Sequence, residues 1–290
     1  MRIVRTKREL REELAPTRRA GETIGLVPTM GALHDGHLSL LRPARERCNV
    51  VVMSLFVNPT QFRSDEDLGS YPRDEARDAE LAKAEGVDLI YAPATEEVYP
   101  AGFATTVEVG GGLTDVLDGD PAHRGPEHFR GVTTIVAKLF NTVQPQVAFF
   151  GQKDGQQGIA IRRMVRDLDF PVEIVLLPTV READGLALSS RNAYLSPDER
   201  ERAAALSRAL RAAEAVATSG ETSTAAALDA ARAELAAAGI EPEYLEARDA
   251  RGLEPVESFN ERPVMVAVAA QVGRARLIDN VVIGTGDQPG

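Results

Sequence analysis

Two histidines, three positions apart, stand in the glycine-containing segment PTMGALHDGH at residues 28–37. If this segment opens a helix, His34 and His37 share one face at its N-terminus. Backbone N–H groups and the helix dipole favour anions there, and an imidazolium adds hydrogen-bond donors for triphosphate oxygens. The alternatives are a tight turn with exposed histidines, or half of a metal site that lacks a nearby third ligand. The segment favours phosphate binding.

Amide and charged side chains follow two other apolar runs. Asn58 and Gln61, after the run at 50–57, carry donors and acceptors that suit hydroxyls and a carboxylate. The Asn-Pro pair that starts this segment equally favours a plain turn. Lys153 and Asp154 follow a run that ends FFG, where the lysine suits phosphate charge and the aspartate suits a ribose hydroxyl. A polar helix start with Asp154 as its N-cap is the alternative.

A fourth polar cluster, LSSRN at residues 188–192, lies in a glycine-containing loop. The hydroxyls of Ser189 and Ser190 precede Arg191, whose forked guanidinium suits phosphate oxygens. The alternative is a surface loop that leads to a capped helix at Ser196. By itself this motif is weak, so its meaning depends on where the fold places it.

The segments between these clusters alternate between strand and helix patterns. Such alternation predicts a parallel sheet covered by helices on both faces, a doubly wound α/β fold. In this fold ligands bind at the carboxyl ends of the strands, where all four clusters stand. The expected strands are 23–27, 50–57, 87–91, 147–150 and 172–177, and the expected helices are 37–47, 72–85, 132–143 and 159–167.

The pattern changes after residue 177. A capping box with proline at the first helical position, SPDE at 196–199, begins an alanine-rich helix that we expect to reach Gly220. A second alanine-rich helix at 223–238 and strands at 244–247, 264–272 and 276–282 are expected to follow. We therefore expect a doubly wound domain over residues 1–177 and a smaller α+β domain over residues 178–290 that covers the active site.

The composition excludes several classes of protein. A net charge of −11 over 290 residues argues against broad nucleic-acid binding, yet a locally basic pocket still allows a small anionic substrate. The single cysteine, Cys48, excludes an internal disulfide framework and a cysteine-based zinc site. We find no long apolar run and no secretory signal at the start. We expect a cytoplasmic protein with no nucleic-acid or membrane partner.

Taken in order, the polar clusters resemble the motifs of the pantothenate synthetase family, and the similarity covers most of the chain. HDGH is similar to the HIGH motif of the wider Rossmann-like, adenylate-forming nucleotidylyltransferase superfamily. LSSRN is similar to the mobile phosphate-binding loop that has the role of KMSKS there. The matching stretches are VPTMGALHDGHLSLL, SLFVNPTQF, YPRD, HFRGVTTIVAKLFN, FFGQKDGQQ, PTVREADGLALSSRN and RLIDN.

The resemblance implies that pantoate and ATP form pantoyl-adenylate, from which β-alanine displaces AMP to give pantothenate. It also implies Mg²⁺ with ATP, without assigned protein ligands to the metal, and a homodimer. The implied catalytic residues are His34, His37, Lys153 and Arg191, with His37 as the proton donor. The implied ATP contacts are Met30, Gly31, Ala32, Leu33, His34, Asp35, Gly36, His37, Gly151, Gln152, Lys153, Asp154, Val180, Leu188, Ser189, Ser190 and Arg191, and the implied pantoate and β-alanine contacts are Asn58, Gln61 and Gln157.

Two other functions stay open at this point. A nucleotidylyltransferase of the same fold leaves AMP on its product, whereas a ligase releases it. A non-catalytic nucleotide-binding regulator is expected to lack some phosphate-facing side chains, and this chain has all of them. It departs from the family pattern only at positions that remove no catalytic group, among them Pro43, Glu127, Gln152, Gly155 and Leu188.

Overall fold

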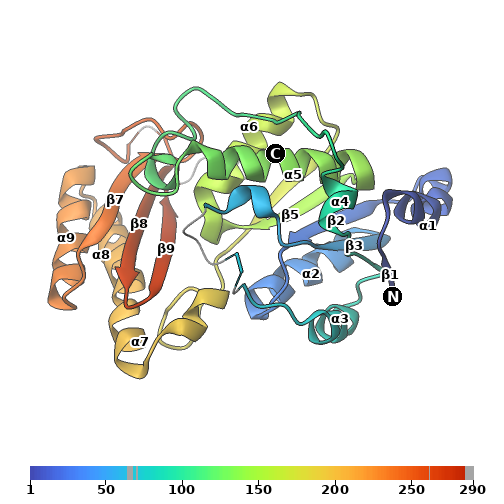
Figure 1. Ribbon diagram of the computed structural model, residues 1–290. Coiled ribbons are helices and arrows are strands. Elements are labelled where there is room, and N and C mark those ends of the chain that lie inside the picture. Colours follow the sequence, from blue (N-terminus) through green and yellow to red (C-terminus); the bar gives the residue numbers. More distant parts are fainter. Residues whose placement is uncertain (64–67, 70, 261, 285–290) are drawn as a thin grey trace.

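The computed structural model describes residues 1–63, 68–69, 71–260 and 262–284, and its larger part is built on a six-stranded sheet (Figure 1). The strand order is β1-β4-β3-β2-β5-β6, and every neighbouring pair is parallel. Parallel neighbours need long crossover connections, which is why strands and helices alternate along the chain. The predicted doubly wound α/β class is confirmed. The strands are β1 (Arg2–Val4), β2 (Ile24–Thr29), β3 (Val50–Leu55), β4 (Leu89–Tyr91), β5 (Val147–Gly151) and β6 (Glu173–Leu177).

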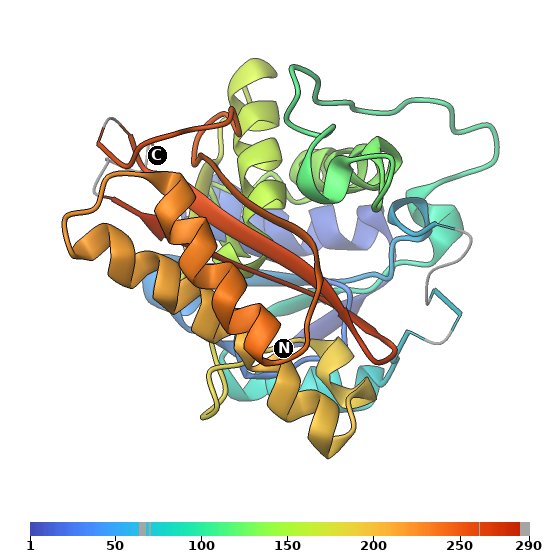
Figure 2. The same cartoon turned by 90° about the vertical axis from the view of Figure 1, so that its left-hand side faces the viewer.

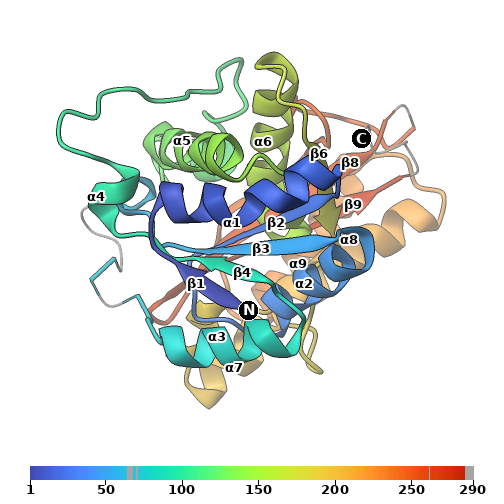
Figure 3. The ribbon, with the colours of Figure 1, turned by 90° about the vertical axis from the view of Figure 1, so that its right-hand side faces the viewer.

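Helices cover both faces of this sheet, with α1, α5 and α6 on one face and α2 and α3 on the other (Figure 3). Leu10 and Leu14 are one helical turn apart in α1 and are fully buried against the first face. Leu41 and Ala44 of α2 are likewise fully buried against the second. The helices are α1 (Lys7–Ala20), α2 (Asp35–Arg47), α3 (Glu75–Ala84), α4 (Thr95–Val98), α5 (Pro126–Val143) and α6 (Gly155–Asp167).

The strand order explains why distant polar segments meet. β3, β2, β5 and β6 are consecutive neighbours in the sheet, and each of them is followed by one of the four predicted polar clusters. Because parallel strands all end at the same edge, the four clusters emerge side by side. The apolar run that forms β3 is buried along its middle, which matches a strand packed on both faces.

The C-terminal part forms an antiparallel sheet in the order β7-β8-β9, and α8 and α9 cover its outer face (Figure 2). Met265 and Ala267 of β8 face the other way and join the hydrophobic cluster of the parallel sheet. The small sheet therefore packs close to the strand ends of the large one. Its elements are α7 (Pro197–Ala203), α8 (Ala205–Thr218), α9 (Thr224–Ala237), β7 (Pro242–Asp249), β8 (Val264–Val272) and β9 (Ala275–Ile283).

The structure differs from the sequence prediction in several elements. β1 and α1 were not predicted, although Thr6 and Glu9 form a complete capping box at the start of α1. α2 begins at Asp35 and continues through Pro43, and α5 begins at Pro126, six residues before the predicted start. The alanine-rich helix divides into α7 and α8 at Ala204. Within the described chain, no helix is long and apolar enough to cross a membrane.

Candidate active site

The strand ends open on one cavity with about 1410 Å³ of atom-free space, including its open mouth. Most of the predicted site residues line the cavity: Met30, His34, Gly36, His37, Gln61, Gly151, Lys153, Asp154, Gln157, Val180, Leu188, Ser189, Ser190 and Arg191. Six predicted residues are not in the cavity wall: Gly31, Ala32, Leu33, Asp35, Asn58 and Gln152.

The two histidines form the N-terminal turn of α2, with their ring centroids 4.1 Å apart. The backbone N–H of Gly36 donates to Nδ1 of His34 at 3.2 Å, and the N–H of His34 donates to Nδ1 of His37 at 3.4 Å. Because each Nδ1 accepts a hydrogen bond, each neutral ring carries its hydrogen on Nε2. The pair therefore supplies two ring N–H donors at a helix N-terminus, where anions are favoured.

The pKa values of both histidines are lowered, which favours their neutral form. Burial, and then the charge of His34, lowers the pKa of His37 to about 3. Burial, and then the charge of Lys153, lowers the pKa of His34 as well. The imidazolium expected from the spacing of the two histidines is therefore not the favoured form, because partial burial and the nearby Lys153 disfavour a positive charge on the rings.

The turn before the histidines is held by a buried carboxylate of α3. Asp78 is 1% exposed, and its two oxygens accept the backbone N–H groups of Ala32 at 2.9 Å and Leu33 at 2.8 Å. Gly31 and Ala32 have φ values of 86° and 52°, so the chain passes through the left-handed region here. Since these N–H groups already have a partner, the turn positions the histidines and does not offer its own amides to phosphate.

Gln61 reaches the cavity from the short turn η1 (Pro59–Gln61). Asn58 is 1% exposed, and its Nδ2 donates to Oε1 of Gln61 at 3.0 Å and to the carbonyl of Gly131 at 3.2 Å. His128 donates from Nδ1 to the Gln61 carbonyl at 2.7 Å. A Cβ at position 131 would lie 2.3 Å from the Thr60 carbonyl, so glycine lets α5 approach this turn. Asn58 holds Gln61 here, and its own contact with substrate stays a prediction.

The turn η3 (Gln152–Asp154) follows β5 and carries Lys153 into the cavity. Lys153 Nζ lies 3.4 Å from the carboxylate of Asp154. Asp154 precedes α6 but makes no side-chain cap hydrogen bond, so the alternative that it serves only as an N-cap loses its support. Gln157 lines the cavity from the first turn of α6.

The serine–arginine loop is ordered by its own contacts. Ser189 caps the turn η4 (Ser190–Tyr194) by accepting the backbone N–H of Arg191 at 3.3 Å. Asn192 donates to the carbonyl of Ala187 at 3.0 Å and to Glu182 at 3.1 Å. These bonds hold the loop from which Ser189, Ser190 and Arg191 line the same cavity as Lys153.

A buried network from the C-terminal sheet was not predicted. Asp118 accepts hydrogen bonds from Tyr244 at 2.8 Å and from Arg276 at 2.9 Å. Burial alone would raise the pKa of Asp118, but the charge and hydrogen bond of Arg276 outweigh it and lower that pKa. Asp118 and Tyr244 line the cavity, as do Met265 and residues 278–280 of β9. The only sequence signal for this wall was the matching stretch RLIDN.

Metal binding by the protein alone has little support. Across the described ranges, no group of three or more His, Cys, Asp or Glu side chains is placed to hold a metal ion. Of the carboxylates in the cavity wall, Asp118 contacts Arg276, Asp154 contacts Lys153, and Asp279 contacts an arginine as well.

Known proteins share this chain's sequence and fold. The family model described as pantoate-beta-alanine ligase matches residues 2–282. The pantothenate synthetase of Moorella thermoacetica is 54% identical over 288 residues, which cover 99% of this chain and 100% of that protein. The crystal structure of pantothenate synthetase from Thermus thermophilus has a TM-score of 0.91 and 50% identity, covering 97% of this chain and 99% of that chain.

A more distant solved structure agrees. It is the pantoate-beta-alanine ligase of Francisella tularensis, complexed with beta-gamma ATP and beta-alanine. This relative is 30% identical and has a TM-score of 0.79, and the match covers 99% of this chain and 99% of that chain. The chain belongs to the pantoate–β-alanine ligase family.

Proposed function

We infer that this protein is an ATP-dependent ligase that joins pantoate to β-alanine and releases AMP and pyrophosphate. One observation carries the inference: the phosphate-binding donors and the paired glutamines line the same cavity. His34 and His37 supply N–H donors, Lys153 and Arg191 supply positive charge, and Gln61 and Gln157 supply neutral amides. The Francisella tularensis relative, complexed with beta-gamma ATP and beta-alanine, supports both co-substrates.

The first step makes a leaving group from a carboxylate. The carboxylate oxygen of pantoate attacks the α-phosphorus of ATP, the mixed anhydride forms, and pyrophosphate leaves with the electron pair of the broken P–O bond. Negative charge grows on the departing phosphates, and Lys153, Arg191 and the hydroxyls of Ser189 and Ser190 are positioned to stabilise it. Holding acid and phosphorus in line supplies a further part of the rate.

The second step forms the amide. The neutral amine of β-alanine attacks the acyl carbon, AMP leaves with the electron pair of the C–O bond, and the nitrogen gives up one proton. Gln61 and Gln157 suit pantoate because an amide bonds hydroxyls and a carboxylate without ionising. No side chain has to become covalently attached, so the cavity needs to hold the acyl-adenylate and to exclude water.

The histidines act in this scheme as N–H donors to the phosphates. Their neutral form lets the empty site avoid a buried positive charge, and bound phosphates raise an imidazole pKa again. His37 is the candidate proton donor to the departing pyrophosphate. This assignment rests on the position of the ring at the start of α2.

We propose that Mg²⁺ accompanies ATP and is bound chiefly by phosphate oxygens and water. The donor set fits this arrangement, because Mg²⁺ commonly takes one or two carboxylates plus substrate phosphates, and no three-carboxylate group stands in the described chain. Of the three cavity carboxylates, Asp154 is the most exposed and its contact with a cation is the longest, at 3.4 Å, so it is the candidate ligand. Bound Mg²⁺ would neutralise phosphate charge.

Three further features stay predictions. We propose a domain boundary near Leu177, where β6 ends and the chain leaves the parallel sheet. A homodimer is proposed from the resemblance, and sedimentation of the purified protein at several concentrations tests it. The cytoplasmic location is proposed from the kind of reaction, since ATP and a biosynthetic acid meet there.

Product analysis tests the function against its rivals. Pantoate labelled with heavy oxygen in its carboxylate is incubated with ATP and β-alanine, and the products are separated and weighed by mass spectrometry. The ligase predicts pantothenate and free AMP that carries one labelled oxygen. A nucleotidylyltransferase would keep AMP on the final product, and a non-catalytic regulator would form no product. His37→Ala is expected to lose the reaction, whereas the matched variant His123→Ala, outside the cavity wall, is expected to keep it.

A further inference from the structure

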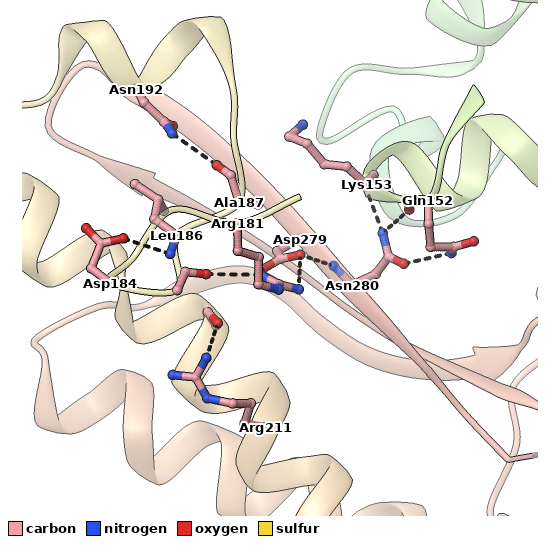
Figure 4. Close-up of polar contacts among 12 residues, drawn as sticks. Gln152, Lys153, Arg181, Asp184, Leu186, Ala187, Asn192, Arg211, Asp279 and Asn280 are labelled. Atoms are coloured by element: carbon pink, nitrogen blue, oxygen red, sulfur yellow. Dashed lines mark hydrogen bonds and ion pairs between the residues drawn. The ribbon is translucent and has the colours of Figure 1, made fainter. Parts of the chain in front are cut away.

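Asp279 and Asn280 are consecutive residues of β9, the strand at one edge of the C-terminal sheet (Figure 4). Both are buried, with exposed fractions of 3% and 6%, and both line the cavity. Side chains of consecutive strand residues point in opposite directions, so one dipeptide can reach two different segments. Neither residue has a role in the steps described above.

Asn280 holds the backbone of the lysine turn η3. Its Nδ2 donates to the carbonyl of Gln152 at 2.9 Å and to the carbonyl of Lys153 at 2.8 Å. Its Oδ1 accepts from Nε2 of Gln152 at 2.9 Å. Three hydrogen bonds from one buried amide therefore fix the two residues from which the Lys153 side chain projects.

Gly155 permits this close approach. A Cβ at position 155 would lie 2.8 Å from Sδ of Met265 and 3.1 Å from Nδ2 of Asn280. Contacts this short show that the start of α6 packs directly against the side chains of Met265 in β8 and Asn280 in β9, with no room for a side chain at position 155. The hydrogen bonds of Asn280 thus belong to a tight contact between the C-terminal sheet and the turn η3 that precedes α6.

Asp279 holds the other phosphate-facing loop. Its carboxylate pairs with both terminal nitrogens of Arg181, at 2.5 and 3.1 Å. Arg181 also donates to the carbonyl of Gly185 at 3.2 Å and forms a backbone bridge with Ala187. The hairpin closed in this way leads directly to Leu188, whose N–H bonds to the carbonyl of Val180. Asp279 therefore anchors the base from which the serine–arginine loop extends.

We propose that Asp279 and Asn280 are positioning residues that set the spacing between Lys153 and the Ser189–Arg191 loop. A phosphate chain bridges these two groups only if their separation is fixed, and adjacent residues of one strand tie both to the same rigid element. The C-terminal sheet therefore helps to form the nucleotide site by holding these two segments. This inference rests on the proposed ligase function.

The test compares Asn280→Ala and Asp279→Asn with a matched control, Asp249→Asn. Asp249 is 4% exposed, pairs with Arg262 at 3.0 Å in the same sheet, and is outside the cavity wall. Steady-state kinetics give kcat and KM for ATP, pantoate and β-alanine, and thermal unfolding reports stability. We expect Asn280→Ala to raise KM for ATP and to lower kcat, so that kcat/KM for ATP falls by roughly tenfold to a hundredfold. The KM for β-alanine is expected to stay unchanged. The control is expected to lose stability only.

A double-mutant cycle separates positioning from general support. If Asn280 acts through Lys153, Asn280→Ala costs little further activity in a Lys153→Ala background. If both losses multiply, or if Asn280→Ala behaves as the control does, the proposal is overturned. Arg181→Lys keeps the charge but loses the paired contact, so it tests the Asp279 anchor should Asp279→Asn fail to fold. Failure of the ligase function looks different, because wild type itself then forms no pantothenate.

Discussion

The neutral histidine at the start of α2 predicts how stability depends on pH. His37 has a pKa of about 3 in the folded protein, whereas an unfolded imidazole has a pKa of about 6.5. Below pH 6.5 the unfolded chain binds a proton that the folded protein does not bind. Unfolding is therefore favoured as the pH falls from 6.5 towards 3, and this loss levels off below the folded pKa.

The two pKa values give the size of the effect. At pH 5 the unfolded imidazole is almost fully protonated and the folded one is not, so the free energy of unfolding falls by about 2 kcal/mol through this residue. At pH 7.5 the contribution is close to zero. His37→Gln removes the titrating group and keeps a polar side chain, so the variant should lose about 2 kcal/mol less than wild type between these two pH values.

Urea unfolding followed by far-ultraviolet circular dichroism measures the difference, since the chain has no tryptophan to serve as a fluorescent probe. Wild type, His37→Gln and His123→Gln are compared at pH 7.5 and pH 5. His123→Gln removes a histidine outside the pair and should keep most of the wild-type loss. Equal losses in wild type and His37→Gln would refute the lowered pKa of this ring.

Three other outcomes follow from the site. Asp78→Asn replaces an acceptor of two backbone N–H groups, so it should lower the free energy of unfolding by about 1–3 kcal/mol and weaken ATP use, measured by urea unfolding and by KM for ATP. Gly131→Ala forces a Cβ onto the Thr60 carbonyl, so it should cost about 1–3 kcal/mol in the same unfolding assay and raise KM for pantoate. Arg191→Lys keeps the charge but loses the forked donor, so adenylation in single-turnover assays should slow by about tenfold or more, with unchanged stability.

The sequence predicted β2 to β6 of the large sheet because these strands contain apolar runs, but it did not predict β1. The run that forms β3 and the glycine that ends α3 are strong local signals, and the elements built on them were found within a few residues. α5 was predicted too short, because its start at Gly125-Pro126 lies in a cluster of histidines and arginines that carries no apolar period. α1 was missed although its capping box is complete, because Pro16 lies inside it and only Leu10 and Leu14 mark its buried face.

Contacts between distant segments could not be predicted from the sequence. The position of Lys153 after a strand end predicts that it reaches a ligand, but not that Asn280 holds its carbonyl from another sheet. Asp78 looks like any surface acid of a charged helix, and only the packing of α3 against the turn at Leu33 buries it. The protonation state of His37 was predicted wrongly for the same reason. It depends on the surroundings of the ring in the folded protein and not on the spacing of the two histidines in the sequence.

Exchange of labelled pyrophosphate into ATP tests the central claim most directly. The account predicts exchange that depends on pantoate, proceeds without β-alanine and is nearly abolished in His37→Ala. Exchange that requires another carboxylic acid would keep the mechanism and contradict the substrate. No exchange with any acid, although ATP binds, would contradict the ligase function and favour a nucleotide-binding regulator.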